Sequence, residues 1–231
     1  MIKIVHANDL FRRPILAASM FRDRALQFRE RLNWGAIELD DLGLEFDEYD
    51  DLNPVYIIIE DERGEHCASV RLMPTTGRTM LNEHFTGLTG DSEIRSPLIW
   101  EATRLCLSRR REVDGAILRR APSALFWATC DLALRSGVEF LVAVYFTHMQ
   151  RVWKLAGFEP EVLGAQDTED GEICAGLWEL TPEFRDYLAE RSGMIGKRAL
   201  EYFPSEDRFP VRDPHTRLNP MAIASEIAQL V

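Results

Sequence analysis

The sequence lacks the patterns that mark several large classes of enzyme. Its four cysteines form no C-x-x-C pair, and its five histidines are dispersed without the spacing of metal ligands. It has no phosphate-binding P-loop, no Rossmann glycine pattern and no serine-nucleophile elbow. We therefore expect no metal site, and we expect buried, reduced cysteines in a cytoplasmic protein.

Long apolar runs and evenly spread positive charge are also missing. No stretch approaches the roughly 18 apolar residues of a membrane span, and the N-terminus has no signal-peptide cleavage pattern. The formal net charge is −11, and the interval between Arg31 and Arg63 contains eleven acidic residues and no basic one. The rest of the chain is balanced, so the sequence predicts no contact with nucleic acid or membrane.

What the sequence does contain is an alternation of helical and strand periodicities. They predict strands at 2–6, 55–60, 66–73, 98–107, 138–146 and 173–180, and helices at 14–33, 115–136, 147–156 and from Thr181 onward. A helix between 98–107 and 138–146 indicates two parallel neighbours, whereas tight turns make the earlier strands antiparallel. We expect a single α/β domain, residues 1–192, with a mixed sheet and helices on both faces. A proline-punctuated C-terminal extension, 193–231, follows it.

A charged pair interrupts the apolar strand predicted at 98–107. Glu101 and Arg104 lie three residues apart in the segment I-W-E-A-T-R-L-C, and an unpaired charge in a core strand is too costly to keep. Side chains of a regular strand alternate between faces, so these two should point in opposite directions. If they serve one site, the strand must contain a bulge, and bulges are common beside active sites.

Two further groups have both a functional and a plain structural interpretation. Arg24 and Phe28 lie one turn apart on the first helix, near Trp34, and could bind a carboxylate and a cation or adenine. The alternative is a surface arginine above core aromatic residues. Asp47 and Asp50, in F-D-E-Y-D-D, could attract a cationic substrate or pair with an arginine. The alternative is an acidic loop whose aspartates form turns.

Arg71 lies in mid-strand, where a central position would require a carboxylate partner, and Phe85 is most simply a core aromatic. Together with the residues above, they resemble the motif set of the acyl-homoserine-lactone synthases, the autoinducer synthases of bacterial quorum sensing. The resemblance runs from about residue 5 to 180 and rests on the order and spacing of Arg24, Phe28, Trp34, Asp47, Asp50, Arg71, Phe85, Glu101 and Arg104. The sequence departs from the family in the Ala-Thr after Glu101, where many members have Leu-Ser, and in its longer C-terminal tail.

The resemblance implies an N-acetyltransferase-like fold and a reaction between S-adenosylmethionine and an acyl thioester. The amine of S-adenosylmethionine attacks the thioester, and its carboxylate then displaces the sulfonium, which closes the lactone and releases methylthioadenosine. S-adenosylmethionine is thus a substrate, and no cofactor is expected. Glu101 is expected to act as general base and Arg104 as substrate clamp. The expected S-adenosylmethionine site consists of Arg24, Phe28, Trp34, Asp47, Asp50, Arg71, Phe85 and Arg104.

The sequence leaves the acyl donor open between acyl carrier protein and coenzyme A. Relatives on this fold bind coenzyme A phosphates with a glycine loop at a helix start, and residues 111–116 resemble a degraded version of that loop. A basic patch predicted to dock an acidic carrier protein consists of Arg110, Arg119, Arg120, Arg151 and Lys154. The alternative is an ordinary solvated helix face.

The acyl pocket is expected at Trp100, Phe146 and Met149. Members that prefer 3-oxo chains often have threonine where Phe146 stands, so we expect an acyl group without 3-oxo substitution, with short, branched and aromatic chains as candidates. Two other functions stay open: a generic N-acyltransferase that uses acyl-coenzyme A and another amine, and a non-catalytic relative. The degraded phosphate loop disfavours the first, and the intact charged positions disfavour the second.

Overall fold

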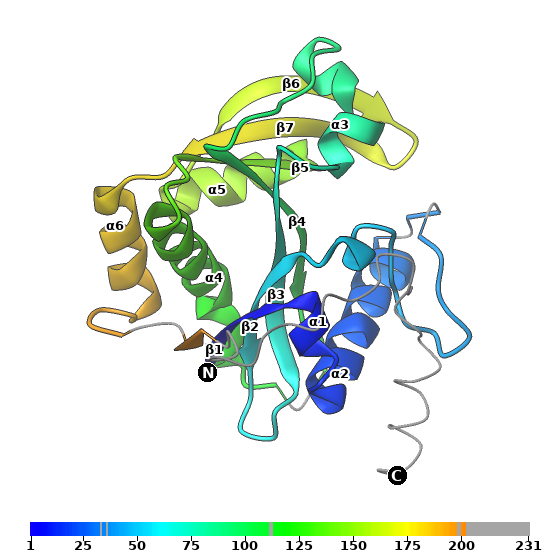
Figure 1. Cartoon of the computed structure of the whole chain (residues 1–231), viewed down its shortest axis with the longest axis vertical. Helices are drawn as coiled ribbons and strands as arrows, with labels where there is room; N and C mark the ends of the chain where they lie inside the picture. The colour runs from blue at the N-terminus through cyan, green and yellow to red at the C-terminus, as the bar shows by residue number, and fades with distance from the viewer. Residues whose placement is uncertain (33, 36, 111–112, 198–199, 202–231) are drawn as a thin grey trace.

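The computed structural model describes residues 1–32, 34–35, 37–110, 113–197 and 200–201 (Figure 1). One mixed sheet runs through it in the strand order β6-β7-β5-β4-β3-β2-β1-β8. Its strands are β1 (Ile2–His6), β2 (Val55–Glu60), β3 (His66–Pro74), β4 (Ile99–Leu107), β5 (Phe140–Phe146), β6 (Glu161–Thr168), β7 (Gly171–Glu179) and β8 (Leu200–Glu201).

Helices cover both faces of the sheet, as the sequence predicted. α1 and α2 lie on one face, and α4 lies on the other with α6 outside it (Figure 1). The alternation along β2 explains this, because Tyr56 and Ile58 pack under α2 while Ile57 and Ile59 pack with α4. The helices are α1 (Ala7–Leu10), α2 (Pro14–Ala25), α3 (Met80–His84), α4 (Gly115–Arg135), α5 (Gln150–Ala156) and α6 (Pro182–Ser192), with short π and 3₁₀ segments η1 (Leu26–Arg31), η2 (Asp50–Leu52), η3 (Thr86–Thr89) and η4 (Thr147–Met149).

The strand directions also agree with the sequence. β1 to β4 pair antiparallel in order, and α4 carries the crossover to β5, which is parallel to β4. The β4–β5 pairing lasts for only three residues on each strand, Ile99–Glu101 against Phe140–Val142. Beyond Glu101 the two strands separate, and this opening lies next to the charged pair on β4.

Several elements differ from the sequence-based expectation. The first helix changes at Leu26 into the π-helical turn η1, and the five-residue helix α3 was not foreseen. β6 was missed because it is largely exposed at the sheet edge and lacks an apolar period. No helix among the described residues is long and apolar enough to cross a membrane.

The C-terminal extension stays a prediction. Its first part includes β8, which pairs in parallel with β1 through Lys3 and Leu200. Residues 198–199 and 202–231 lie outside the described part of the chain.

Candidate active site

Six charged side chains form a closed ring of ion pairs on the face of the sheet that α2 covers. Three arginines alternate with three carboxylates in the order Glu45, Arg24, Asp50, Arg71, Asp47 and Arg104, and Arg104 returns to Glu45. Each charge therefore has two neighbours of opposite sign, and the ring as a whole is neutral. We call these six residues the ion-pair ring.

The pairs of the ion-pair ring are hydrogen-bonded, except that of Arg104 with Asp47, which is a close ion pair. Arg24 holds Asp50 with two bonds of 2.9 and 3.0 Å, and Arg71 Nη1 lies 2.7 Å from Asp50 Oδ1. Arg104 Nη2 lies 2.8 Å from Asp47 Oδ2, while its Nε lies 3.0 Å from Glu45 Oε1. Such pairing compensates the loss of hydration that burial imposes on each charge.

The ring keeps Asp47 and Asp50 ionised. Burial alone would raise the pKa of Asp50, but Arg24 and Arg71 outweigh it and hold that pKa well below its usual range. Burial also opposes ionisation of Asp47, yet the charge of Arg71 leaves its pKa lowered. The side chains of Arg24, Asp50 and Arg71 are at most 1% exposed, whereas those of Asp47 and Arg104 are 16% and 7% exposed. A ligand can therefore reach the ring most directly at Asp47 and Arg104.

The acidic segment builds its side of the ring through a tight turn. Asp47 Oδ1 accepts hydrogen bonds from the backbone N–H groups of Tyr49 at 3.0 Å and Asp50 at 3.2 Å. The carboxylate of Asp50 accepts from the N–H of Asp47 at 3.0 Å and from the hydroxyl of Tyr56. The two aspartates thus form a turn and also pair with the arginines, whereas attraction of a cationic substrate stays a prediction.

β4 bulges at Arg104, as the three-residue spacing of the charged pair predicted. Ser69 and Arg71 of β3 pair with Cys106 and Thr103 of β4, so the interval on β4 is one residue longer. Arg104 itself has a φ of 53°, in the left-handed region that non-glycine residues seldom adopt. Such a conformation costs about 1–3 kcal/mol and persists where the surroundings hold it. The extra residue turns the Arg104 side chain to the ion-pair ring.

Glu101 lies on the same face, fully buried and bonded to the start of α3. Its two carboxylate oxygens accept the backbone N–H groups of Met80 at 3.1 Å and Leu81 at 2.7 Å. Burial raises the pKa of Glu101, and these two N–H bonds reduce the rise without abolishing it. Because a carboxylate has about four lone-pair sites, Glu101 can still accept a proton from a substrate or a water.

Three rings continue the site from Arg104 toward β5. The Arg104 guanidinium lies over Phe28 at 5.4 Å, Phe28 stacks on Trp34 at 5.1 Å, and Trp34 contacts Phe146 at 5.7 Å. We call Phe28, Trp34 and Phe146 the aromatic wall. Phe85 packs in the apolar cluster that also contains Phe146. All the residues expected to bind S-adenosylmethionine therefore lie on one face of the sheet, although their roles stay predictions.

The opening between β4 and β5 leads to a cavity of about 80 Å³ on the face that α4 covers. Its walls are mainly apolar and aromatic and include Leu125, Phe126, Ala143, Tyr145, Trp153 and Trp178. Trp100 and Met149 pack against the core around this cavity, whereas Phe146 lies on the opposite face against Trp34. Because successive residues of β5 alternate between faces, Ala143 and Tyr145 line the cavity and Phe146 does not. The three-residue acyl pocket stays a prediction, and the cavity offers other lining residues.

The basic residues predicted to dock a carrier protein fall into two kinds. Arg110 points inward, where its guanidinium bonds Glu65, Ser108 and the carbonyl of His66. Arg119, Arg120, Arg151 and Lys154 are exposed on α4 and α5. Docking by these four stays a prediction, and of the degraded phosphate loop Arg111 and Glu112 lie outside the described residues.

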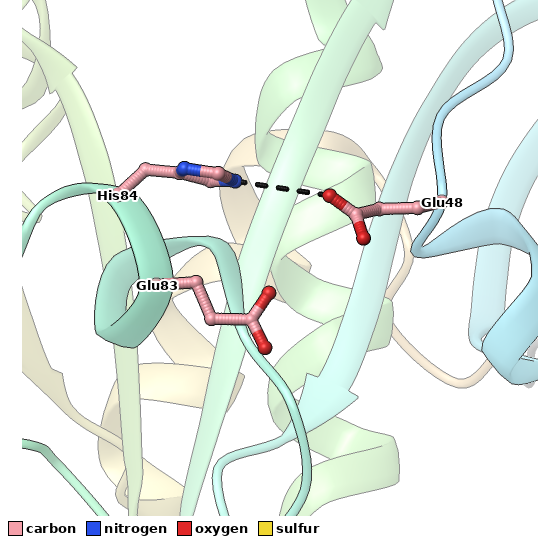
Figure 2. Close-up of side chains that lie close together, drawn as sticks. All are labelled: Glu48, Glu83 and His84. Atoms are coloured by element: carbon pink, nitrogen blue, oxygen red, sulfur yellow. Dashed lines mark ion pairs between the residues drawn. The ribbon is translucent and has the colours of Figure 1, made fainter.

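A second cluster of ionisable groups lies beside the site and is exposed. Figure 2 shows Glu48, Glu83 and His84, whose ligand atoms lie within 4.8 Å of one another. Arg78 donates hydrogen bonds to both carboxylates, and with the hydroxyl of Tyr49 it lowers the pKa of Glu83 to about 2. Because Arg78 already binds both carboxylates, we assign no metal ion to them.

One member of the ion-pair ring, Glu45, is not among the site residues predicted from the sequence. Glu45 is fully buried and joins Arg24 to Arg104. Its position two residues before Asp47 was visible in the acidic run, but nothing in that run distinguishes an inward carboxylate from a solvated one.

Comparisons with known proteins agree with this geometry. The sequence model of a family described as autoinducer synthase matches residues 9–181. An acyl-homoserine-lactone synthase from Rhizobium etli is 37% identical over 166 residues, which are 71% of this chain and 77% of the relative. Among solved structures, that of the coenzyme A-dependent acyl-homoserine lactone synthase BjaI, with S-adenosylmethionine and isopentyl-coenzyme A, has a TM-score of 0.75 at 26% identity and covers 100% of this chain and 99% of that one. A Lactobacillus plantarum protein provisionally assigned as an N-acetyltransferase has a TM-score of 0.51 at 18% identity, covers 78% of this chain and 99% of its own, and shows the shared fold.

Proposed function

Since this chain belongs to the autoinducer synthase family, we propose that it makes an N-acyl-L-homoserine lactone from S-adenosylmethionine and an acyl thioester. The amine of S-adenosylmethionine loses a proton and attacks the thioester carbonyl, so an amide bond forms and the thiol leaves. The carboxylate oxygen then attacks the carbon next to the sulfonium. The C–S bond breaks, the lactone closes, and methylthioadenosine leaves.

One observation carries the proposal: the bulge at Arg104 joins three features at a single point of the sheet. The ion-pair ring, the aromatic wall and the opening between β4 and β5 all meet there. A substrate with a carboxylate, an ammonium and a sulfonium needs a cation, acids and ring faces close together. The adjoining apolar cavity suits the acyl chain of the second substrate.

Within this site, the exposed edge of the ring meets the substrate. Arg104 binds the carboxylate of S-adenosylmethionine, Asp47 attracts its ammonium, and Phe28 and Trp34 face the sulfonium and adenine. The remaining predicted residues lie deeper in the site and support it. Asp50 forms buried ion pairs with Arg24 and Arg71, and Phe85 completes this inner part. This division assigns the carboxylate clamp to Arg104 rather than to Arg24.

Glu101 acts as general base for the amine, through a water molecule. Its buried position raises its pKa, which brings the carboxylate closer to the pKa a base needs near neutral pH. Proton transfer of this kind contributes about 10²–10⁴-fold in rate. Backbone N–H groups near the bulge stabilise the oxyanion that forms on the thioester.

The acyl donor we favour is acyl-coenzyme A with a short chain. A solved relative at 26% identity is described as coenzyme A-dependent, and Arg110 is committed to internal contacts rather than to a docking surface. The cavity of about 80 Å³ is roughly half the 150 Å³ of an apolar cavity that accommodates benzene. Short or branched chains therefore fit it better than long ones.

The reaction needs no cofactor beyond the two substrates, and we place it in the cytoplasm. The four cysteines are buried and unpaired, which suits a reducing compartment.

A single assay tests the proposal. Purified protein is incubated with S-adenosylmethionine and a panel of acyl-coenzyme A and acyl-carrier-protein thioesters, and methylthioadenosine and lactone are measured by mass spectrometry. We expect both products in equal amounts, with the highest kcat/KM for a short acyl-coenzyme A. An acylated amine without methylthioadenosine would instead identify a generic N-acyltransferase, and the highest kcat/KM for an acyl-carrier-protein would refute the donor assignment.

A further inference from the structure

Past the bulge, β4 still pairs with β3, but on its other edge, where β5 has separated, its backbone is held by a side chain. Ser108 donates its N–H to Cys67 of β3 at 2.8 Å, and alternate residues of an antiparallel strand point their backbone groups away from the partner. The N–H of Leu107 therefore points away from β3, toward the edge from which β5 has separated. Left alone there, it and the carbonyl of Leu105 would lack the partners that buried backbone groups require.

Gln27 supplies both partners. Its side-chain Nε2 donates to the carbonyl of Leu105 at 2.7 Å, and its Oε1 accepts the N–H of Leu107 at 3.1 Å. Gln27 is 8% exposed, so these bonds form in a shielded environment where each counts for more. The side-chain amide of Gln27 thus replaces one backbone N–H donor and one backbone carbonyl acceptor of an adjacent strand.

The same residue is tied to the substrate face. Gln27 belongs to the π-helical turn η1, in which its carbonyl accepts the N–H of Leu32 at 3.0 Å, and π turns are frequent at functional sites. The next residue, Phe28, lies under the guanidinium of Arg104. Leu105, which Gln27 holds, directly follows Arg104 and its φ of 53°.

We propose that Gln27 is a positioning residue that locks the bulged backbone of β4 and so fixes Arg104 for the carboxylate of S-adenosylmethionine. The proposal rests on the function given above for Arg104. Without the amide, Arg104 can relax toward ordinary strand geometry, which would turn its side chain away from the ion-pair ring. Gln27 itself does not touch the substrate.

The test uses Gln27→Met, which keeps the length of the side chain and removes both hydrogen bonds. We expect the KM for S-adenosylmethionine to rise about tenfold, the equivalent of about 1.4 kcal/mol, while the KM for the acyl thioester stays unchanged. Gln27→Glu retains an acceptor for Leu107 and loses the donor to Leu105. Its KM for S-adenosylmethionine should therefore lie between those of the wild type and of Gln27→Met.

A matched control separates positioning from general loss of stability. Thr181 accepts the N–H of Phe184 and caps α6, which lies on the far side of α4 from α2 (Figure 1). Thr181→Ala should lower the melting temperature and leave both KM values unchanged. An unchanged KM for S-adenosylmethionine in folded Gln27→Met, or an equal rise of both KM values, would overturn the proposal. Binding of S-adenosylmethionine, measured by calorimetry, tests Gln27 even if the wild type made no lactone. Failure to make lactone would instead contradict the proposed function.

Discussion

The ion-pair ring makes a strong prediction about Glu45, the member that the sequence did not reveal. Glu45→Gln replaces a buried carboxylate by a neutral amide of the same shape and leaves Arg24 and Arg104 with one carboxylate partner each. The ring then contains three cations and two anions in a buried environment. Removing one partner of a buried pair costs about 3–5 kcal/mol, because the remaining charge is left uncompensated.

The lower end of that range applies here. Both arginines keep their bonds to an aspartate, so each loses half of its charge partners rather than all of them. We therefore expect the free energy of unfolding to fall by about 3 kcal/mol. For a domain of this size, about 2–4 °C of melting temperature corresponds to each kcal/mol, so the melting temperature should fall by about 6–12 °C.

Urea unfolding at neutral pH measures the change, and Glu60→Gln provides the control. Glu60 also forms a buried ion pair, with Lys3, but it does not belong to the ring, so Glu60→Gln measures what the loss of a buried carboxylate costs outside the ring. Combining Glu45→Gln with Arg104→Gln removes one anion and one cation, and the double variant should be more stable than the sum of the single effects by about 1 kcal/mol or more. If Glu45→Gln costs less than about 1 kcal/mol, or if the two effects add, the closed ring is not the unit that we describe.

Three further predictions concern catalysis and donor choice. Glu101→Gln should fold normally and lose about 10²–10⁴-fold in kcat, and full turnover would contradict its assignment as base. The double charge reversal Arg119→Glu/Arg120→Glu should lower kcat/KM about tenfold or more with an acyl-carrier-protein donor and less than twofold with acyl-coenzyme A; an equal loss with both would argue against carrier docking at this surface. Ala143→Leu adds three carbons to the cavity wall and should shift the product profile, measured by mass spectrometry, toward shorter acyl chains, whereas an unchanged profile would place the acyl group elsewhere.

The sequence predicted the charged site better than it predicted the contacts within it. Glu101 and Arg104 demanded a bulge because strand side chains alternate, and that local rule is readable from spacing alone. The closed ring was not readable, because it joins residues up to 59 positions apart, such as Glu45 and Arg104. Only the packing of α2 on the sheet brings them together.

Two expectations that stay predictions depend on which way a side chain turns. Arg110 and Arg119 are both arginines of the predicted basic patch, yet the side chain of Arg110 turns inward to Glu65 and that of Arg119 faces solvent. Phe146 was assigned to the acyl pocket from its strand, but the alternation along β5 places it with Trp34. Which way a side chain turns depends on partners that are distant in sequence, so patterns that identify an element do not identify what its residues touch.

The charge balance of the site leads to a final prediction about proton linkage. The ion-pair ring contributes no net charge, and ionised Glu101 adds one negative charge, whereas S-adenosylmethionine carries one net positive charge. Burial raises the pKa of Glu101, so the free protein keeps this proton to a higher pH than an ordinary glutamate would. The protonated side chain stabilises the fold below the pKa of the unfolded state, and this stabilisation is lost as pH rises through the pKa of the folded state.

The bound cation favours the carboxylate, so binding of S-adenosylmethionine must lower the pKa of Glu101 and release a proton. The affinity for S-adenosylmethionine should therefore increase as pH rises through that raised pKa and level off above it. Calorimetric titrations in two buffers of different ionisation enthalpy measure the proton release, and Glu101→Gln should abolish it. Equal heats in both buffers for the wild type across the acid range would show that Glu101 is already ionised before the substrate binds.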